Sequence, residues 1–139
     1  GRDFYRIVMM GECPDLPKMD DKEEWNIMYG AMKVLAFDED LMMNIWKVTA
    51  ATMHLTNIEF TSTQSDGMDA SEVSGATESL VADAASMIDA SNDDLSDGLT
   101  SRSIVTRGET TIKPLSASAA AATRDAFAKG IYGRMFIDI

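Results

Sequence analysis

The stretch SRSIVTRGETTIKPLSASAAAATRDAFAKGIYGRMF, residues 101–136, decides the fold because it joins a short basic hairpin to a long helix with little chain between them. Runs rich in β-branched residues at 103–105 and 110–112 flank Arg107-Gly108, and a glycine at the tip of two strands supplies the positive φ of a tight turn. Pro114 lacks the N–H that a strand ladder needs, so it ends the second strand. The stretch therefore predicts a β-hairpin.

A long helix is predicted directly after this hairpin, over about residues 119–136. Ser116 or Ser118 is placed to cap its first turn, because a serine hydroxyl accepts hydrogen bonds from the free backbone N–H groups of a helix start. Phe127, Ile131 and Met135 follow one another at intervals of four residues, which predicts one buried stripe along the helix.

Two further helices are predicted in the N-terminal half of the chain. The first begins at Asp20 or Asp21, and its apolar residues recur at intervals of three and four. They predict a buried face made of Trp25, Met28, Met32 and Leu35. Asp38 caps the second helix, whose predicted buried face is Leu41, Ile45, Val48, Thr52 and Leu55. The short connection between the two predicts an αα-hairpin.

The middle of the chain predicts one short strand, one exposed loop and two short helices. Residues 58–61 alternate apolar and polar side chains, whereas residues 62–75 are polar, contain two glycines and have no periodicity. Leu80, Ala84 and Met87 indicate a third helix, and the sequence from Ser91 resembles a capping box for a fourth that ends near Gly98. The predicted fold is mainly α, with a short strand and a β-hairpin.

The composition is that of a single globular domain that does not span a membrane. A chain of 139 residues can bury one core, and no apolar run approaches the roughly 18 residues that a membrane helix requires. The lone Cys13 cannot form an internal disulfide, which fits a reducing compartment. We therefore expect a cytoplasmic protein.

The charge of the chain is strongly negative and unevenly distributed. Residues 1–99 carry 20 acidic and 6 basic side chains, which argues against nucleic acid or an anionic membrane as partner. The hairpin is the exception, because Arg102, Arg107 and Lys113 against Glu109 give it a net charge of +2. This basic hairpin suits an acidic protein surface, and it is also compatible with a simple solvated turn.

The order of several segments resembles the myosin motor domain. TSRSIVTRGETTIKPLS and RDAFAKGIYGRMF are similar to the cardiomyopathy loop and the helix after it in unconventional myosins, most closely those of classes seven and fifteen. Upstream, MDDKEEWNIMYGAMKVLAF, residues 45–51 and MHLTNIEF resemble the two helices and the strand that precede this loop. The resemblance covers roughly residues 4–136, so residues 1–139 are interpreted as part of the upper 50-kilodalton region of a motor domain.

The resemblance implies a partner and a set of contact residues. Residues 62–75 would be loop four and residues 101–115 the cardiomyopathy loop, both of which face the actin filament in myosins. Glu109 falls where myosins carry an acidic or phosphorylatable residue that governs actin-activated turnover. The implied partners are actin and the remainder of the motor domain, at a cytoskeletal location. The candidate actin contacts are Arg102, Thr106, Arg107, Gly108, Glu109 and Lys113.

The catalytic elements of a myosin ATPase are missing from this sequence. No G-x-x-x-x-G-K-S/T phosphate loop occurs, nor does the Asn- and Ser-rich first switch. Asp138-Ile139 matches only the first two residues of the second switch. We therefore expect no catalytic residue, cofactor or metal in this segment, with Mg-ATP bound elsewhere in the parent motor.

Several alternative readings rest on single features. His54 is interpreted as a satisfied structural histidine, and the eleven methionines as flexible core residues rather than a peptide-binding groove. The acidic run at Asp93, Asp94 and Asp97 lacks the ligand spacing of a calcium loop. The alternatives to a motor segment are a free-standing interaction module with a myosin-derived fold and a small calcium or peptide sensor.

Overall fold

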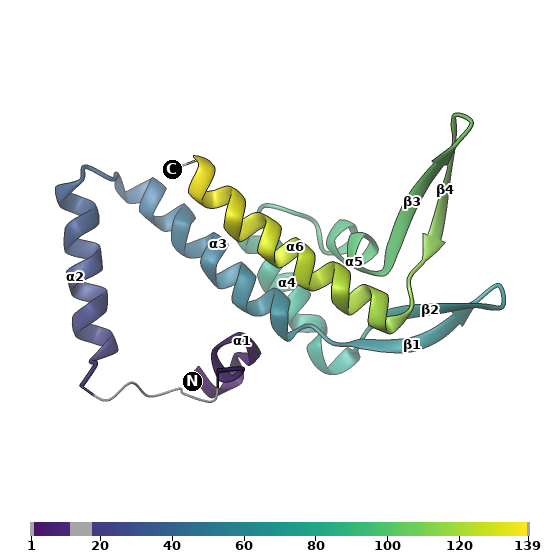
Figure 1. The fold of residues 1–139 in the computed structure, drawn as a ribbon, viewed down its shortest axis with the longest axis horizontal. Helices are drawn as coiled ribbons and strands as arrows, with labels where there is room; N and C mark the ends of the chain where they lie inside the picture. The colour runs from purple at the N-terminus through teal and green to yellow at the C-terminus, as the bar shows by residue number, and fades with distance from the viewer. Residues whose placement is uncertain (1, 12–17, 139) are drawn as a thin grey trace.

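A computed structural model of the chain describes residues 2–11 and 18–138, which form helices and two small antiparallel sheets (Figure 1). The mainly α prediction is confirmed. Cys13 and Ile139, used in the sequence interpretation, lie outside the described residues. The elements are η1 (Arg2–Phe4), α1 (Arg6–Met9), α2 (Asp21–Val34), α3 (Glu39–Asn57), β1 (Phe60–Ser65), β2 (Met68–Val73), η2 (Gly75–Thr77), α4 (Glu78–Met87), α5 (Asn92–Thr100), β3 (Ser101–Thr106), β4 (Glu109–Pro114) and α6 (Ala117–Asp138).

Helix α3 is the centre of the helical body and packs against both α4 and α6. Helices α3 and α6 run side by side in opposite directions (Figure 1). The buried cluster draws on α3 through α6, and burial of these apolar side chains supplies the main stabilisation of the body. Its members are Leu55, Ile58, Leu80, Val81, Ala84, Ala85, Leu95, Leu99 and Ala128.

The predicted helix caps are confirmed by the hydrogen bonds at the helix starts. The Asp20 carboxylate accepts from Lys22 N at 2.9 Å, and that of Asp38 accepts from Leu41 N at 2.7 Å. Ser91 Oγ likewise accepts from Asp94 N at 3.0 Å. Ser116, not Ser118, accepts from the first turn of α6, which begins at Ala117. Each cap satisfies backbone donors that have no partner within the helix.

The buried face predicted for α2 is wrong. The helix has no buried residue, and Trp25 and Leu35 keep 44% and 71% of their surface exposed. Figure 1 shows α2 standing apart from the helical body instead of lying along α3, so the predicted αα-hairpin does not form. An aromatic contact joins the two helices, with the ring centres of Trp25 and Trp46 4.5 Å apart. The spacing of three and four residues marked an apolar face correctly, but the described chain covers it only in part, at the Trp25–Trp46 contact.

The burial predicted for the apolar stripe on α6 is also wrong. Phe127 remains 36% exposed, and Ile131 and Met135 are half-buried. The buried face of α6 is formed by Ala120, Arg124 and Ala128, because small side chains allow the helix to approach its neighbours closely. The methionine prediction fails in the same way: of the eleven, all in described positions, Met42 alone is buried.

The exposed loop predicted at residues 62–75 is a second β-hairpin. Strands β1 and β2 pair antiparallel from Phe60↔Val73 to Ser65↔Met68. Asp66 and Gly67 form the turn with φ of 51° and 75°, and a two-residue turn with two positive φ angles matches the twist of its strands. The Asp-Gly pair is a strong hairpin signal that would have identified this element from the sequence.

Candidate functional site

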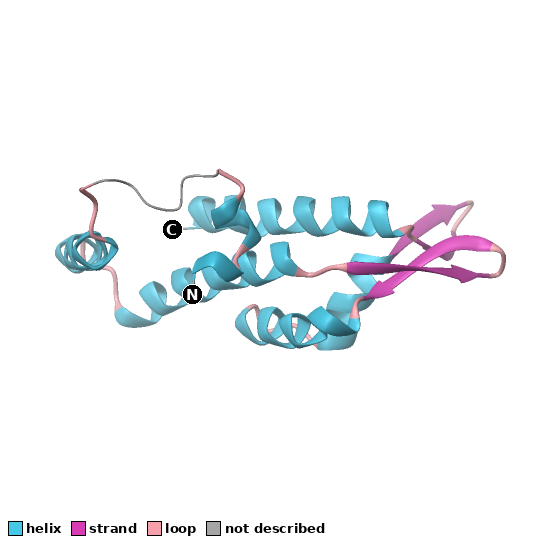
Figure 2. Cartoon of the chain, turned by 90° about the horizontal axis from the view of Figure 1, so that it is seen from below, coloured by secondary structure: helices cyan, strands magenta, loops and turns pink. Residues whose placement is uncertain are grey.

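Two hairpins project from the same end of the helical body (Figures 1 and 2). They meet at their bases, where Ser71 Oγ of β2 donates to the carbonyl of Leu115, 2.8 Å away. The N–H of Leu115 in turn donates to Thr100 O at the end of α5, also at 2.8 Å. These bonds connect both hairpins to each other and to the helices.

A buried arginine holds the start of the first hairpin to α6. Arg124 is 2% exposed and donates from its guanidinium to the carbonyl of Ile58, which lies between α3 and β1. Its Nε and Nη2 atoms lie 2.8 Å and 2.6 Å from Asp125 Oδ1. A buried charge needs such partners, and here they make Arg124 a link between the helix after one hairpin and the chain before the other.

The predicted hairpin at residues 101–114 is confirmed, and its register sorts its side chains onto two faces. Directly opposite residues share a face, and successive pairs alternate between faces. One face carries the pairs Arg102↔Lys113, Ile104↔Thr111 and Thr106↔Glu109. The other carries Ser103↔Ile112 and Val105↔Thr110, and it bears no charge. All the strand charges of this hairpin therefore lie on one face.

The six candidate contact residues are exposed. The register brings Arg102 beside Lys113 and Thr106 beside Glu109, while the remaining two form the turn. Arg107 and Gly108 have φ of 54° and 86°. Within residues 2–11 and 18–138, none of the four charged side chains makes an ion pair or a side-chain hydrogen bond. Their charges are available to a partner.

The first hairpin carries the opposite charge. Strands β1 and β2 with their turn contain Asp66, Asp69 and Glu72 and no basic residue. The sequence pattern had predicted an exposed loop for these carboxylates. The structure instead fixes them on a hairpin whose base touches that of the basic one.

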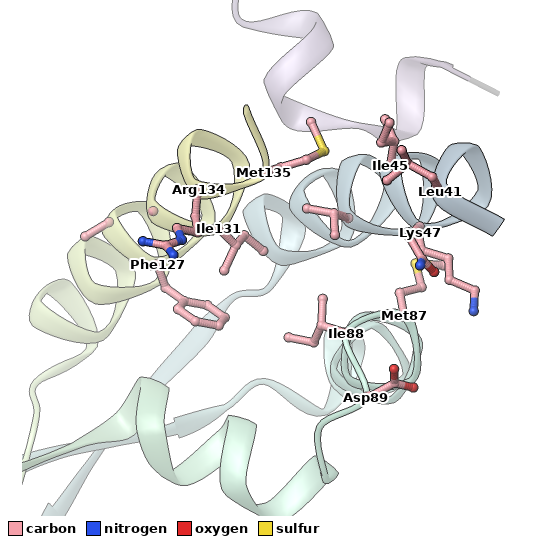
Figure 3. A pocket seen from close by; sticks show the side chains of 14 residues that line it. Leu41, Ile45, Lys47, Met87, Ile88, Asp89, Phe127, Ile131, Arg134 and Met135 are labelled. Carbon is pink, nitrogen blue, oxygen red and sulfur yellow. The ribbon is translucent and has the colours of Figure 1, made fainter. Parts of the chain in front are cut away.

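An open apolar groove of about 730 Å³ lies on the helical body between α3, the end of α4 and α6 (Figure 3). Phe127 and Ile131 point into it from α6, and Ile88 faces them from the turn after α4. The floor also includes Leu41 and Ile45 of α3. The lining is mostly apolar and so suits apolar surface, while Lys47, Asp89 and Arg134 supply its charged side chains. The groove is the feature that the buried-stripe prediction missed.

The His54 side chain is 14% exposed, and its Nδ1 atom is buried. Its Nδ1 lies 3.9 Å from Asp83 Oδ2, beyond hydrogen-bond distance, and has no hydrogen-bond partner among the described residues. The Tyr5 ring and the imidazole pack at a right angle, with ring centres 5.6 Å apart. A structural place in the α3–α4 contact fits this geometry, whereas the predicted full satisfaction is wrong.

The sequence has no phosphate-cradling loop, and the described residues contain no group of three or more His, Cys, Asp or Glu side chains arranged to hold a metal ion. No helix in the described part of the chain is long and apolar enough to cross a bilayer.

The family model described as "Myosin head (motor domain)" matches residues 2–139. This chain belongs to the myosin motor-domain family. Among curated proteins it is 36% identical to myosin-VIIa of Drosophila melanogaster over 97% of the chain and 6% of that protein. It is 30% identical to unconventional myosin-Ic of Mus musculus over 95% of the chain and 12% of that protein. The chain thus spans about a tenth of these myosins, and the resemblance inferred from its motifs is confirmed.

Proposed function

We propose that this chain is one segment of an actin-based, ATP-driven motor and that it presents two β-hairpins to the actin filament. In this assignment residues 62–75 serve as loop four and residues 101–115 as the cardiomyopathy loop. The observation that supports it best is the projection of both hairpins from one end of the body, joined at their bases by the bond from Ser71 to Leu115.

The residues proposed to contact actin act by electrostatic attraction and have no catalytic role. Arg102, Arg107 and Lys113 supply positive charge towards an acidic filament, with Thr106 and Gly108 beside them at the tip of the hairpin. Glu109 supplies a permanent carboxylate at the position that governs actin-activated turnover in the family, so no kinase is needed there. The segment does not hydrolyse ATP by itself, and nucleotide belongs to other parts of the motor.

The exposed apolar surfaces of the helical body are proposed to pack against the remainder of a motor domain. Helix α2 buries none of its residues, and the groove lined by Phe127 and Ile131 is open. Exposed apolar patches of this kind usually mark interaction sites. The same surfaces argue against the free-standing module, which would gain nothing from leaving them uncovered.

Cosedimentation of the chain with actin filaments at low and high ionic strength tests the proposal. We expect weak binding that falls steeply with salt, because few charges drive it and the screening length shrinks from about 10 Å at 0.1 M to about 3 Å at 1 M. Arg102→Gln, Arg107→Gln and Lys113→Gln together should abolish the salt-dependent part. Lys22→Gln, Lys47→Gln and Lys129→Gln form a control of equal charge outside the hairpins. Absence of binding at low salt, or equal loss in both variants, would contradict the proposal.

A further inference from the structure

The tripeptide Ser-Asp-Gly occurs twice in this chain, each time followed by a large apolar residue. Residues 65–68 read SDGM, and residues 96–99 read SDGL. Asp66 and Asp97 are exposed to solvent, and so is the glycine after each of them. The two copies therefore share their local sequence and their access to water, and they differ in backbone structure.

The first copy forms the tip of the β1–β2 hairpin, the end that points away from the helical body (Figure 1). Asp66 and Gly67 are the two turn residues between the paired strands, with φ of 51° and 75°. Within the described residues the Asp66 carboxylate forms no hydrogen bond or ion pair, and the Gly67 N–H donates to no carbonyl. A carboxyl group and a backbone nitrogen thus stand next to each other with no competing partner.

The second copy lies inside α5, where hydrogen bonds hold the backbone. Each N–H within an α-helix donates to the carbonyl four residues earlier, and this engages the N–H of Gly98. The carbonyl of Asp97 accepts from the N–H of Ser101 and also from its hydroxyl, the latter at 2.7 Å. Rotation of the peptide group between Asp97 and Gly98 therefore requires several hydrogen bonds to break.

We infer that Asp66 is a modification site, at which the chain converts spontaneously to isoaspartate, and that the fold protects Asp97 from the same reaction. The Gly67 nitrogen attacks Cγ of Asp66, and the hydroxyl of the protonated carboxyl group leaves with the proton of the nitrogen as water. The product is a cyclic succinimide. Water then adds to the backbone carbonyl carbon of residue 66, and the bond from that carbon to nitrogen breaks. The chain now continues through Cγ and carries a free α-carboxylate, with its mass and charge unchanged.

The turn favours ring closure for two physical reasons. Glycine has no side chain to hinder the approach of its nitrogen to Cγ. Ring closure also needs rotation about the Cα–C bond of Asp66, and at an exposed tip this rotation disturbs only the adjoining Ser65↔Met68 pair. In α5 the same rotation requires the helix to open first.

Isoaspartate changes the shape of the turn because it adds Cβ to the main chain. A two-residue turn with two positive φ angles matches the twist of its strands, so an inserted methylene should separate Ser65 from Met68. The base of the hairpin should stay in place, because the Ser71–Leu115 bond holds it. The modification therefore reshapes the acidic tip without altering the net charge, whether or not this hairpin contacts actin.

Prolonged incubation of the chain at neutral pH and body temperature tests the inference. Electron-transfer fragmentation of proteolytic peptides distinguishes isoaspartate from aspartate of equal mass. In the folded chain, isoaspartate should accumulate at least about tenfold faster at Asp66 than at Asp97, because the helix must open before Asp97 can react. In guanidinium chloride the two rates should become similar, because the local sequences match. Equal rates in the folded chain, or no conversion of Asp66 there, would overturn the inference.

Arg107→Asp transfers the same chemistry to the other hairpin. It creates an Asp-Gly pair in a turn with φ of 54° and 86°, which aspartate tolerates. We expect isoaspartate to form at position 107 at a rate comparable to that at Asp66. Conversion of Asp66 alone in this variant would contradict the turn as the cause of the reactivity.

Enzymatic methylation gives an independent readout of the new α-carboxylate. An isoaspartyl carboxyl methyltransferase transfers a methyl group from S-adenosylmethionine to that carboxylate, and S-adenosylhomocysteine leaves. The incubated chain should accept the methyl group, whereas freshly prepared chain should not. Asp66→Ser should abolish most of this incorporation after the same incubation. Full incorporation in Asp66→Ser would place the reactive residue elsewhere and overturn the assignment.

Discussion

Arg107 occupies a backbone conformation that does not suit its side chain. It has φ of 54° at the first turn position of the β3–β4 hairpin, where the β1–β2 hairpin places Asp66 with φ of 51°. Aspartate and asparagine tolerate this region because their short polar side chains can hydrogen-bond locally, whereas arginine gains no such bond and the conformation costs it roughly 1 kcal/mol. Backbone strain often coincides with functional positions, and the guanidinium at this tip fits a contact role.

Arg107→Asn is expected to stabilise the hairpin by about 0.5–1 kcal/mol, because it relieves this strain without changing the turn type. Thermal and denaturant unfolding measure the gain. The same variant should bind actin filaments more weakly at low salt, since one of the three hairpin cations is lost. Asp66→Arg in the other turn is the matched test and should destabilise by a similar amount. A loss of stability in Arg107→Asn would show that the turn does not strain the arginine.

Glu109 is expected to act through its charge. The actin-activated ATPase of a whole motor that carries this segment can test this. Glu109→Ala should lower actin-activated ATPase roughly three- to tenfold and leave the basal rate nearly unchanged, while Glu109→Asp should retain most activity. Glu109→Lys should be at least as damaging as alanine. If the hairpin were only a solvated basic turn, removing its negative charge would strengthen association instead. A lysine variant with improved actin activation would therefore rule out the proposed role.

At the scale of helices and strands, the sequence predicted most reliably the features that depend on residues close together in the chain. The caps at Asp20, Asp38 and Ser91 form as predicted, because a cap needs only a short polar side chain beside free N–H groups. The basic hairpin followed from its strands, turn glycine and Pro114. The acidic hairpin was missed because its strands are mostly polar and only Asp66-Gly67 signals the turn.

Burial could not be predicted because it depends on what an apolar face meets. The spacing of Trp25 and Leu35 on α2 equals that of the buried residues on α3, yet one helix stands apart and the other is central. On α6 the bulky stripe faces an open groove, and the packed side is a row of small residues with Arg124 among them. The contacts of the two hairpin bases, Ser71 with Leu115 and Arg124 with Ile58, join residues 44 and 66 positions apart and leave no local pattern.

Removing the hydrogen bond from Arg124 of α6 to the carbonyl of Ile58 before β1 should lower the stability of the fold measurably. Arg124→Met keeps most of the buried side-chain volume but leaves the carbonyl of Ile58 without its donor, so we expect a loss of about 2 kcal/mol in the free energy of unfolding. Asp125→Asn should cost less than about 1 kcal/mol, because the Asp125 side chain is 57% exposed. Denaturant unfolding of both variants measures the difference, and an equal cost would mean that the ion pair and not the Ile58 bond is what stabilises the link.

At the scale of the whole molecule, the described chain has a compact centre and an extended outline. Its buried cluster lies around α3, while α2 at one end and the two hairpins at the other carry mostly exposed side chains (Figures 1 and 2). The chain corresponds to 6% of the myosin-VIIa relative and 12% of the myosin-Ic relative. A segment of this kind can hold its hairpins in place, since the bonds at their bases are internal to it.

The isolated chain is therefore expected to show neither turnover of Mg-ATP nor saturable nucleotide binding. Nucleotide affinity in this family of reactions comes from backbone N–H groups and a lysine that cradle the β- and γ-phosphates, together with oxygens that hold Mg²⁺. The sequence has no phosphate loop, and its residues 1–99 carry 20 acidic against 6 basic side chains. A polyphosphate would thus meet an excess of negative charge without a loop to cradle it. Calorimetric titration with Mg-ATP measures the affinity, with Mg²⁺ alone as the control, and micromolar binding of the nucleotide would show that the chain holds a phosphate site of a different kind.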